Sequence, residues 1–129
     1  MPERRPFQYT ILRLVPRIER GECINVGVVL FCRQHGFLRA RIGVDESRLR
    51  ALAPGLDATE VRVHLGAIEA VVDGAEEAGA LGRLDQSERF GWVAARSSTV
   101  IQASEVHTGL TDDPAATLEH LYRTLVQTD

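Results

Sequence analysis

Apolar and polar residues alternate along the first third of the chain in a pattern that predicts three consecutive strands. Residues 7–15, 23–33 and 37–44 are rich in β-branched and aromatic residues, and proline, glycine or charged residues bound them. The middle segment is apolar on both of its alternating faces, as expected of a central strand that is covered on both sides. Because the connections between these segments are short, we expect an antiparallel meander.

After residue 44 the spacing of apolar residues changes to a helical period. Asp45 and Asp57 are predicted N-caps of a short helix and a longer one, because an aspartate side chain accepts backbone N–H groups at a helix start. Gly74 fits the C-terminal stop of the longer helix. The expected buried stripe of that helix comprises Val61, Leu65, Ile68 and Val72.

The last third of the chain combines one returning strand with a final helix. A third helical piece is expected to begin at Asp85 or Ser87, and the alternation in residues 97–104 predicts a fourth strand. Residues 105–112 are expected to form a loop. The final helix should begin at Asp113-Pro114, because an acidic N-cap precedes a proline at the first helical position.

These elements predict an α+β fold with a mainly antiparallel four-stranded sheet. The sheet would consist of the three-stranded N-terminal meander plus one returning strand, with helices packed on one face. A length of 129 residues fits a single domain over residues 1–129. No apolar run approaches the roughly 20 residues of a membrane helix, and no apolar segment follows the N-terminal arginines. We therefore expect a cytoplasmic protein without membrane contact.

Composition excludes several chemistries. All 15 basic residues are arginine, so a catalytic lysine, a Schiff base or a phosphate-loop lysine is ruled out. Cys23 and Cys32 would lie about 30 Å apart along one strand, too far for a disulfide, so we expect buried free thiols. Histidine and cysteine do not occur in a zinc-binding spacing, and we expect neither a metal nor a cofactor.

Charge is distributed unevenly along the chain. The first 50 residues hold ten arginines and five acids (+5), and the remainder holds five arginines and 13 acids (−8), which together give the net charge of −3. The basic half either faces an anion or neutralises the acidic half in the fold. Nucleic-acid binding is disfavoured, because it would require more positive charge and more exposed aromatic residues than accompany the arginines at 39, 41, 48 and 50.

The first two candidate sites lie in the predicted meander. Arg13 falls on an apolar strand face, where its charge requires either a carboxylate from Glu19 or Glu22 or an anionic ligand. Asn25 and Gly27 interrupt the most apolar strand. Asparagine can bond a neighbouring backbone, and glycine lets a second backbone or a ligand approach closely, so both alternatives are open.

The third candidate site is the predicted loop that contains His107 and Thr108. It precedes a helix N-terminus, where free N–H groups and the helix dipole favour anions, and histidine can exchange protons near neutral pH. The alternative is that nearby acids already satisfy this terminus. If the fourth strand returns beside the meander, we expect His107 to lie near Arg13, Glu19 or Asn25.

Four segments together resemble the bacterial family called domain of unknown function 3037. They are residues 9–16 (YTILRLVP), 19–22 (ERGE), 25–31 (NVGVVLF), and 107–110 (HTGL) continuing to Asp113-Pro114. The resemblance spans nearly the whole chain and carries over no catalytic residue. Members are often encoded beside HipA-like kinases, which implies an accessory role with such a partner. The matching residues form a candidate binding site: Arg13, Glu19, Arg20, Asn25, Gly27, His107 and Thr108.

Two functions follow from these observations. One is an accessory or binding module that partners a HipA-like kinase. The alternative is a small enzyme or binder that acts on a phosphorylated or nucleic-acid ligand through Arg13, Arg20 and His107. Convergence of the candidate residues in an open pocket would favour the enzyme, and bonding of these residues to one another in a closed core would favour the module. Catalytic residues and a homo-oligomeric state are left open.

Overall fold

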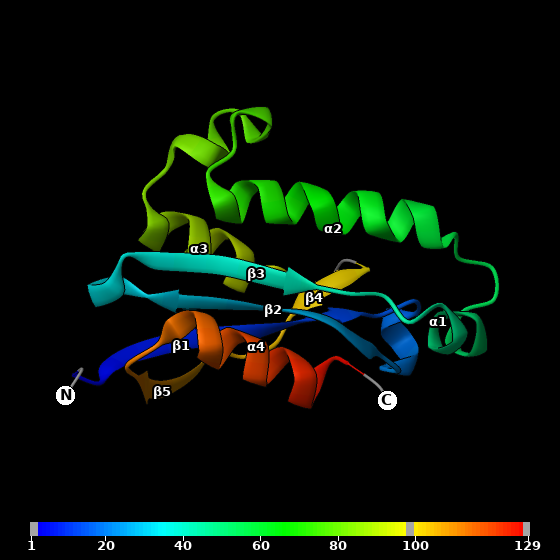
Figure 1. Ribbon diagram of the computed structural model, residues 1–129. Helices are drawn as coiled ribbons and strands as arrows, with labels where there is room; N and C mark the ends of the chain where they lie inside the picture. The colour runs from blue at the N-terminus through cyan, green and yellow to red at the C-terminus, as the bar shows by residue number, and fades with distance from the viewer. Residues whose placement is uncertain (1–2, 98–99, 128–129) are drawn as a thin grey trace.

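A computed structural model describes residues 3–97 and 100–127, and the centre of this part of the chain is a five-stranded antiparallel sheet. The first three strands form the predicted meander, and the last two pair one after the other along the free edge of the first (Figure 1). The strands are β1 (Arg5–Leu14), β2 (Ile24–Cys32), β3 (Phe37–Ile42), β4 (Ile101–Ala103) and β5 (His107–Thr111).

The described residues also form four α-helices: α1 (Glu46–Leu52), α2 (Ala58–Asp73), α3 (Gln86–Ala94) and α4 (Pro114–Leu125). Gly74 ends α2 in the left-handed conformation that glycine tolerates (φ 66°). None of the described helices is long and apolar enough to cross a membrane. The predicted helix starts are confirmed, because each helix begins at an aspartate whose side chain accepts a backbone N–H: Asp45, Asp57, Asp85 and Asp113.

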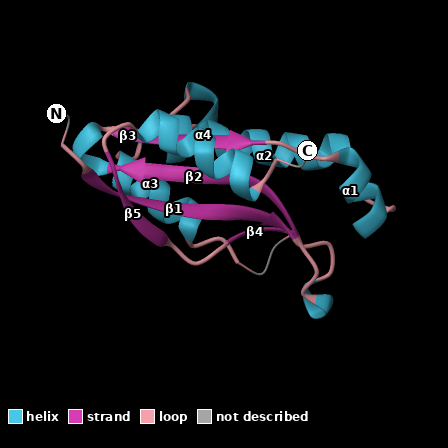
Figure 2. Ribbon diagram, turned by 60° about the horizontal axis from the view of Figure 1, so that its bottom comes forward, coloured by secondary structure: helices cyan, strands magenta, loops and turns pink. Residues whose placement is uncertain are grey.

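Helices cover both faces of the sheet (Figures 1 and 2). On one face α2 and α3 pack Leu65, Ile68 and Phe90 into a core that includes alternate residues of β2 such as Val29. On the opposite face α4 packs against the intervening residues of β2, in a second core that includes Val28. The predicted α+β class with an antiparallel sheet is confirmed. Helices lie on two faces rather than one because β2 is apolar on both faces and requires cover on each.

A β-bulge in β2 determines which residues share a face. Leu12 lies opposite Gly27 and Arg13 lies opposite Asn25, so Val26 is the extra residue. Val26 belongs to the core under α2 and α3. Asn25 therefore points toward α4, together with Arg13 on the neighbouring strand.

The expectation of a loop over residues 105–112 was wrong, because His107–Thr111 forms β5 against the first half of β1. Gly109 lies opposite Phe7, and a Cβ at Gly109 would come within 2.6 Å of the Phe7 ring. Ser104 joins β4 to β5, and its Oγ accepts a hydrogen bond from the Ile11 backbone N–H at 2.8 Å. The strand was missed because its residues are mostly small or polar and its one large apolar residue, Leu110, is exposed.

Candidate functional site

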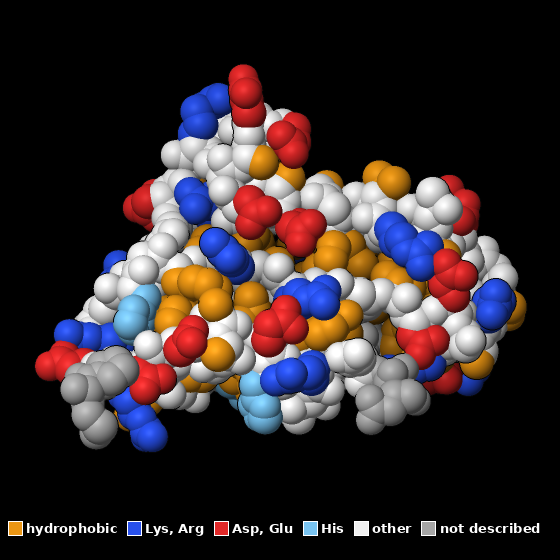
Figure 3. All heavy atoms as spheres, viewed as in Figure 1, with side chains coloured by type: hydrophobic (Ala, Val, Ile, Leu, Met, Phe, Trp, Pro, Cys, Tyr) orange, Lys and Arg blue, Asp and Glu red, His pale blue; other side chains and the backbone are white. Residues whose placement is uncertain are grey.

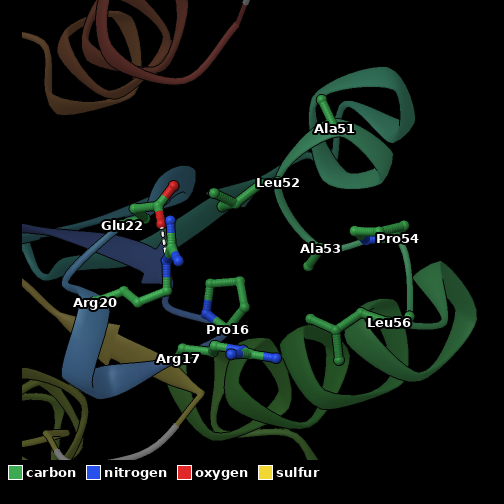
Figure 4. A pocket seen from close by; sticks show the side chains of 10 residues that line it. Pro16, Arg17, Arg20, Glu22, Ala51, Leu52, Ala53, Pro54 and Leu56 are labelled. Atoms are coloured by element: carbon green, nitrogen blue, oxygen red, sulfur yellow. Dashed lines mark hydrogen bonds and ion pairs between the residues drawn. The ribbon is translucent and has the colours of Figure 1, made fainter.

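A pocket of about 560 Å³ opens at the end of the sheet where β1 ends and β2 begins (Figure 4). One wall is the connection between these strands, residues 16–22, and the other is the end of α1 with the connection that follows it, residues 51–56. This volume lies in the range of about 300–1,000 Å³ that small-molecule sites occupy. Its lining includes Pro16, Arg17, Arg20, Glu22, Leu52 and Leu56.

The sequence of the first wall explains its shape. Pro16 follows β1 and cannot donate to a β-ladder, so the chain leaves the sheet at that residue. A 3₁₀ turn, η1 (Ile18–Arg20), follows, and Gly21 closes it with φ 69° and a hydrogen bond from its N–H to the Ile18 carbonyl. The turn holds Arg17 and Arg20 beside the pocket.

The two arginines of the pocket differ in their partners. Arg20 forms an ion pair with Glu22 through its Nε. The exposed Arg17 side chain has no hydrogen bond or ion pair with any residue in the described ranges. In Figure 4 the Arg17 side chain extends from beside Pro16 toward Leu56 on the apolar wall. The pocket therefore combines an uncompensated cation with an apolar surface.

The structure places only part of the predicted site at this pocket. Arg20 lines it, and Glu19 is exposed on the adjacent turn. The predicted pairing of Arg13 with Glu19 or Glu22 is wrong. Glu22 pairs instead with Arg20, two residues away at the mouth of the pocket, whereas Arg13 points to the face of the sheet that carries α4.

Asn25 and Gly27 are used in packing. The Asn25 Nδ2 donates a hydrogen bond to the Leu125 carbonyl at the end of α4, at 2.9 Å. A Cβ at Gly27 would lie 3.0 Å from Ile42 Cγ2 and 3.2 Å from the Arg41 carbonyl oxygen. The sequence left open whether Asn25 and Gly27 contact neighbouring backbone or a ligand. The structure shows contacts with neighbouring backbone at both positions.

His107 lies far from the pocket. It is paired with Tyr9 across β1 and β5, and the two rings stack with centroids 5.1 Å apart. Arg13 is four residues further along β1, about 13 Å away at roughly 3.3 Å per residue. The expected proximity of His107 to Arg13, Glu19 or Asn25 is therefore wrong, because β5 pairs with the first half of β1. Thr108, the neighbour of His107, is exposed.

Arg13 and His107 nevertheless share a face of the sheet with Asn25. The register pairs Arg13 with Asn25 and Tyr9 with His107, and Arg13 and Tyr9 lie an even number of residues apart on β1. Figure 2 shows no helix over β1 and β5 on this side, beside α4. The Arg13 side chain is half-buried and has neither a hydrogen bond nor an ion pair within the described residues.

A polar contact between Arg96, which follows α3, and His64 links this end of α3 to α2. Arg96 Nη2 lies 2.9 Å from His64 Nε2, and the Arg96 guanidinium lies 5.4 Å from the Trp92 ring centroid. Burial lowers the pKa of His64, and the neighbouring Arg96 charge lowers this pKa further. Burial also lowers the pKa of Arg96. Because arginine only donates, a neutral His64 is the acceptor in this pair.

The arginines of β3 do not form a free basic patch. Arg41 Nε donates to Glu119 Oε1 at 2.8 Å, and its guanidinium lies 4.2 Å from the Tyr122 ring centroid. Arg39 lies over the Phe37 ring at 5.4 Å. In the space-filling view, acidic and basic side chains are interspersed on the face that carries β3 and α4 (Figure 3). The charge on this face is mixed.

The described residues offer no metal site and no disulfide. Within the described ranges, no group of three or more His, Cys, Asp or Glu residues is placed to hold a metal ion. Both cysteines are free as expected, but Cys23 is exposed and only Cys32 is buried.

The sequence did not predict Arg17 or the apolar wall of Leu52 and Leu56 as parts of a site. The excess of arginine in the first 50 residues was the available signal for Arg17, and no local pattern links it to a wall some 35 residues later.

Comparison with known proteins identifies one family. A family model described as "Protein of unknown function (DUF3037)" matches residues 9–126. This match includes both walls of the pocket and all of the candidate residues that the sequence nominated. No curated protein and no solved structure matches the chain.

Proposed function

The chain belongs to the DUF3037 family, and we propose that it is an accessory binding module whose recognition site is the pocket between residues 16–22 and 51–56. The observation that carries this proposal is Arg17. Its guanidinium has no counterion among the described residues and extends across the pocket toward Leu56. An uncompensated guanidinium at a pocket wall attracts an anionic group.

The arrangement of the other candidate residues supports a module over an enzyme. Arg13, Arg20 and His107 occupy three separate places, whereas acid–base or nucleophilic catalysis requires its groups within hydrogen-bond reach of one reacting centre. Arginine remains charged in proteins, so Arg17 and Arg20 suit binding rather than proton transfer. The residues of the pocket therefore favour recognition.

The partner in this proposal is a HipA-like kinase. This choice rests on the family resemblance alone, because members of the family are often encoded beside such kinases. The module would recognise an anionic group on that partner or on a ligand that both proteins share. In this proposal the module and the kinase bind each other in the bacterial cytoplasm, without contact with the membrane. A binding experiment with the purified kinase is the specific test of this part of the proposal.

A second candidate function uses the face of β1 that lies beside α4. Arg13 has no counterion within the described residues, and it shares that face with Asn25 and His107. Such a face would suit a small enzyme or binder that acts on a phosphorylated or nucleic-acid ligand. This function ranks second because the Asn25 amide is engaged by Leu125 and the His107 ring is stacked on Tyr9.

The test compares ligand-induced stabilisation in matched charge variants. Wild type, Arg17→Gln, Arg83→Gln and Arg13→Gln are melted with and without a panel of carboxylate and phosphate compounds. Arg83 is the matched control, because it is exposed and does not line the pocket. A bound ligand raises the melting temperature of the folded protein.

We expect a ligand to raise the Tm of wild type, Arg83→Gln and Arg13→Gln, and this rise to be lost in Arg17→Gln. A rise that persists in Arg17→Gln would contradict the proposed site. Loss of the rise in Arg13→Gln alone would favour the second candidate function.

A further inference from the structure

We infer that the pocket takes a single carboxylate carried next to a short aliphatic group. This inference rests on the proposed function, because it names the ligand class of that same pocket. Two sources present this chemistry: a free carboxylic acid, and the C-terminal residue of a protein chain that ends in an aliphatic side chain.

The charge of the pocket indicates a monoanion. Its charged lining residues are Arg17, Arg20 and Glu22, which sum to +1. The ion pair to Arg20 keeps the Glu22 carboxylate at the pocket, where it would repel a second negative charge on the ligand. A phosphate monoester carries about 1.5 to 2 negative charges at neutral pH. A carboxylate carries one charge, and its two oxygens match the fork of donors on the Arg17 guanidinium.

The opposite wall indicates an aliphatic group beside the charge. Leu52 and Leu56 line this wall, they are half-buried, and Figure 4 shows Leu56 facing Arg17. Ala53 between them is 8% exposed and belongs to the core under α2. A fully hydrophilic anion would leave the leucines in contact with water, whereas an aliphatic group would cover them.

Gly55 provides a way to fill the pocket without disturbing the fold. A Cβ built on Gly55 meets no atom within 4 Å, and its backbone does not adopt a positive φ. Gly55→Leu therefore adds a side chain at a lining position where the Cβ meets open space. Gly66 on α2 is the matched control, because it also has open space and does not line the pocket.

The ligand class is tested with three probes that share one branched aliphatic group: 4-methylpentanoate, 4-methylpentanamide and 3-methylbutyl phosphate. Dissociation constants are measured by NMR titration of the wild-type chain. We expect the carboxylate to bind about tenfold more tightly than the amide, because it adds a charge-assisted hydrogen bond. We expect it also to bind more tightly than the phosphate. An amide that binds as well as the carboxylate, or a phosphate that binds better, would overturn the inference.

The source of the carboxylate is distinguished by a second pair of probes, acetyl-leucyl-leucine with a free C-terminus and the same dipeptide as its amide. Tighter binding of the free dipeptide than of 4-methylpentanoate identifies a protein C-terminus as the source. Equal or weaker binding identifies a free carboxylic acid.

Variants separate the failure of this inference from the failure of the proposed function. Gly55→Leu should weaken 4-methylpentanoate binding about tenfold or more, and Gly66→Leu should not. Glu22→Gln raises the charge of the pocket to +2, so it should improve phosphate binding more than carboxylate binding. Phosphate binding that depends on Arg17, without carboxylate binding, would overturn only the ligand class. If no probe binds in a way that depends on Arg17, both proposals fail.

Discussion

The two ends of β1 use polar and aromatic side chains in opposite ways. At the first end, Tyr9 stacks on His107 and the Phe7 ring covers Gly109, so side chains that resemble site residues are engaged in pairing β5 to the sheet. Beyond the other end, Arg17 has no counterion within the described residues. Residue type suggested His107 at the first end, and the absence of a partner identifies Arg17 beyond the second end.

The difference has a structural cause. Along its first half, β1 has β2 on one edge and β5 on the other, so each side chain there has cross-strand neighbours. Pro16 ends this arrangement, and the 3₁₀ turn that follows lies outside the sheet. Side chains of the turn line the pocket opposite the end of α1 and the connection that follows it. That geometry leaves the Arg17 side chain without a counterion among the described residues, which is the basis of the proposed site.

The largest expected effect is that of Gly27→Val, which would break the pairing on which both ends of β1 depend. A side chain at Gly27 would press on Ile42, on the Arg41 carbonyl and on Leu12. We expect the free energy of unfolding to fall by about 2–3 kcal/mol, measured by denaturant titration. Gly66→Ala is the control, because its Cβ meets open space. A melting temperature within about one degree of wild type would refute this role of Gly27.

A smaller effect is expected from Gly109→Ala, which disturbs only the first end of β1. The new Cβ would overlap the Phe7 ring, and the ring would have to move. We expect a loss of about 1–2 kcal/mol, less than at Gly27, because β5 pairs with one strand only in the described sheet. Unchanged stability in urea unfolding would show that Phe7 does not hold β5 in place.

The smallest expected effect on stability depends on pH and concerns the His64–Arg96 pair. The folded pKa of His64 lies below its ordinary value of about 6.5, so the unfolded chain takes up the proton first as the pH falls. The contribution of the His64–Arg96 pair to the free energy of unfolding is therefore fully present above about pH 6.5. This contribution declines as the pH falls toward the lowered folded pKa of His64.

His64→Gln should show a weaker decline of stability than wild type in urea unfolding between about pH 7.5 and pH 5.5. Glutamine keeps an oxygen that can accept from Arg96 and does not titrate. A decline of equal slope in both proteins would mean that His64 is not held neutral by the fold.

Local sequence patterns predicted the elements of this fold well. The N-cap aspartates at 45, 57, 85 and 113 are confirmed because capping depends on residues within one turn. The meander is confirmed because its alternation is strong and its connections are short. The position of α4 on the second face was not predicted, because its apolar stripe does not specify which side of β2 it covers.

The site was harder to predict than the fold, because it depends on partners distant in the chain. His107 was a reasonable candidate by residue type, and only the register with Tyr9 shows that its ring is engaged. No local pattern distinguishes Arg17 from the other arginines of the first 50 residues, and only the fold brings Leu52 and Leu56 to it.

The most direct test of the account is to map where 4-methylpentanoate binds, by chemical-shift changes of the backbone amides in the ¹⁵N-labelled wild-type chain. We expect the largest changes at the amides of residues 17–22, 51–53, 55 and 56 in the two walls of the pocket, and we expect the amides of Tyr9 and His107 to stay unchanged. Changes centred on Tyr9, Arg13 and His107, or no change at either end of β1, would contradict the account.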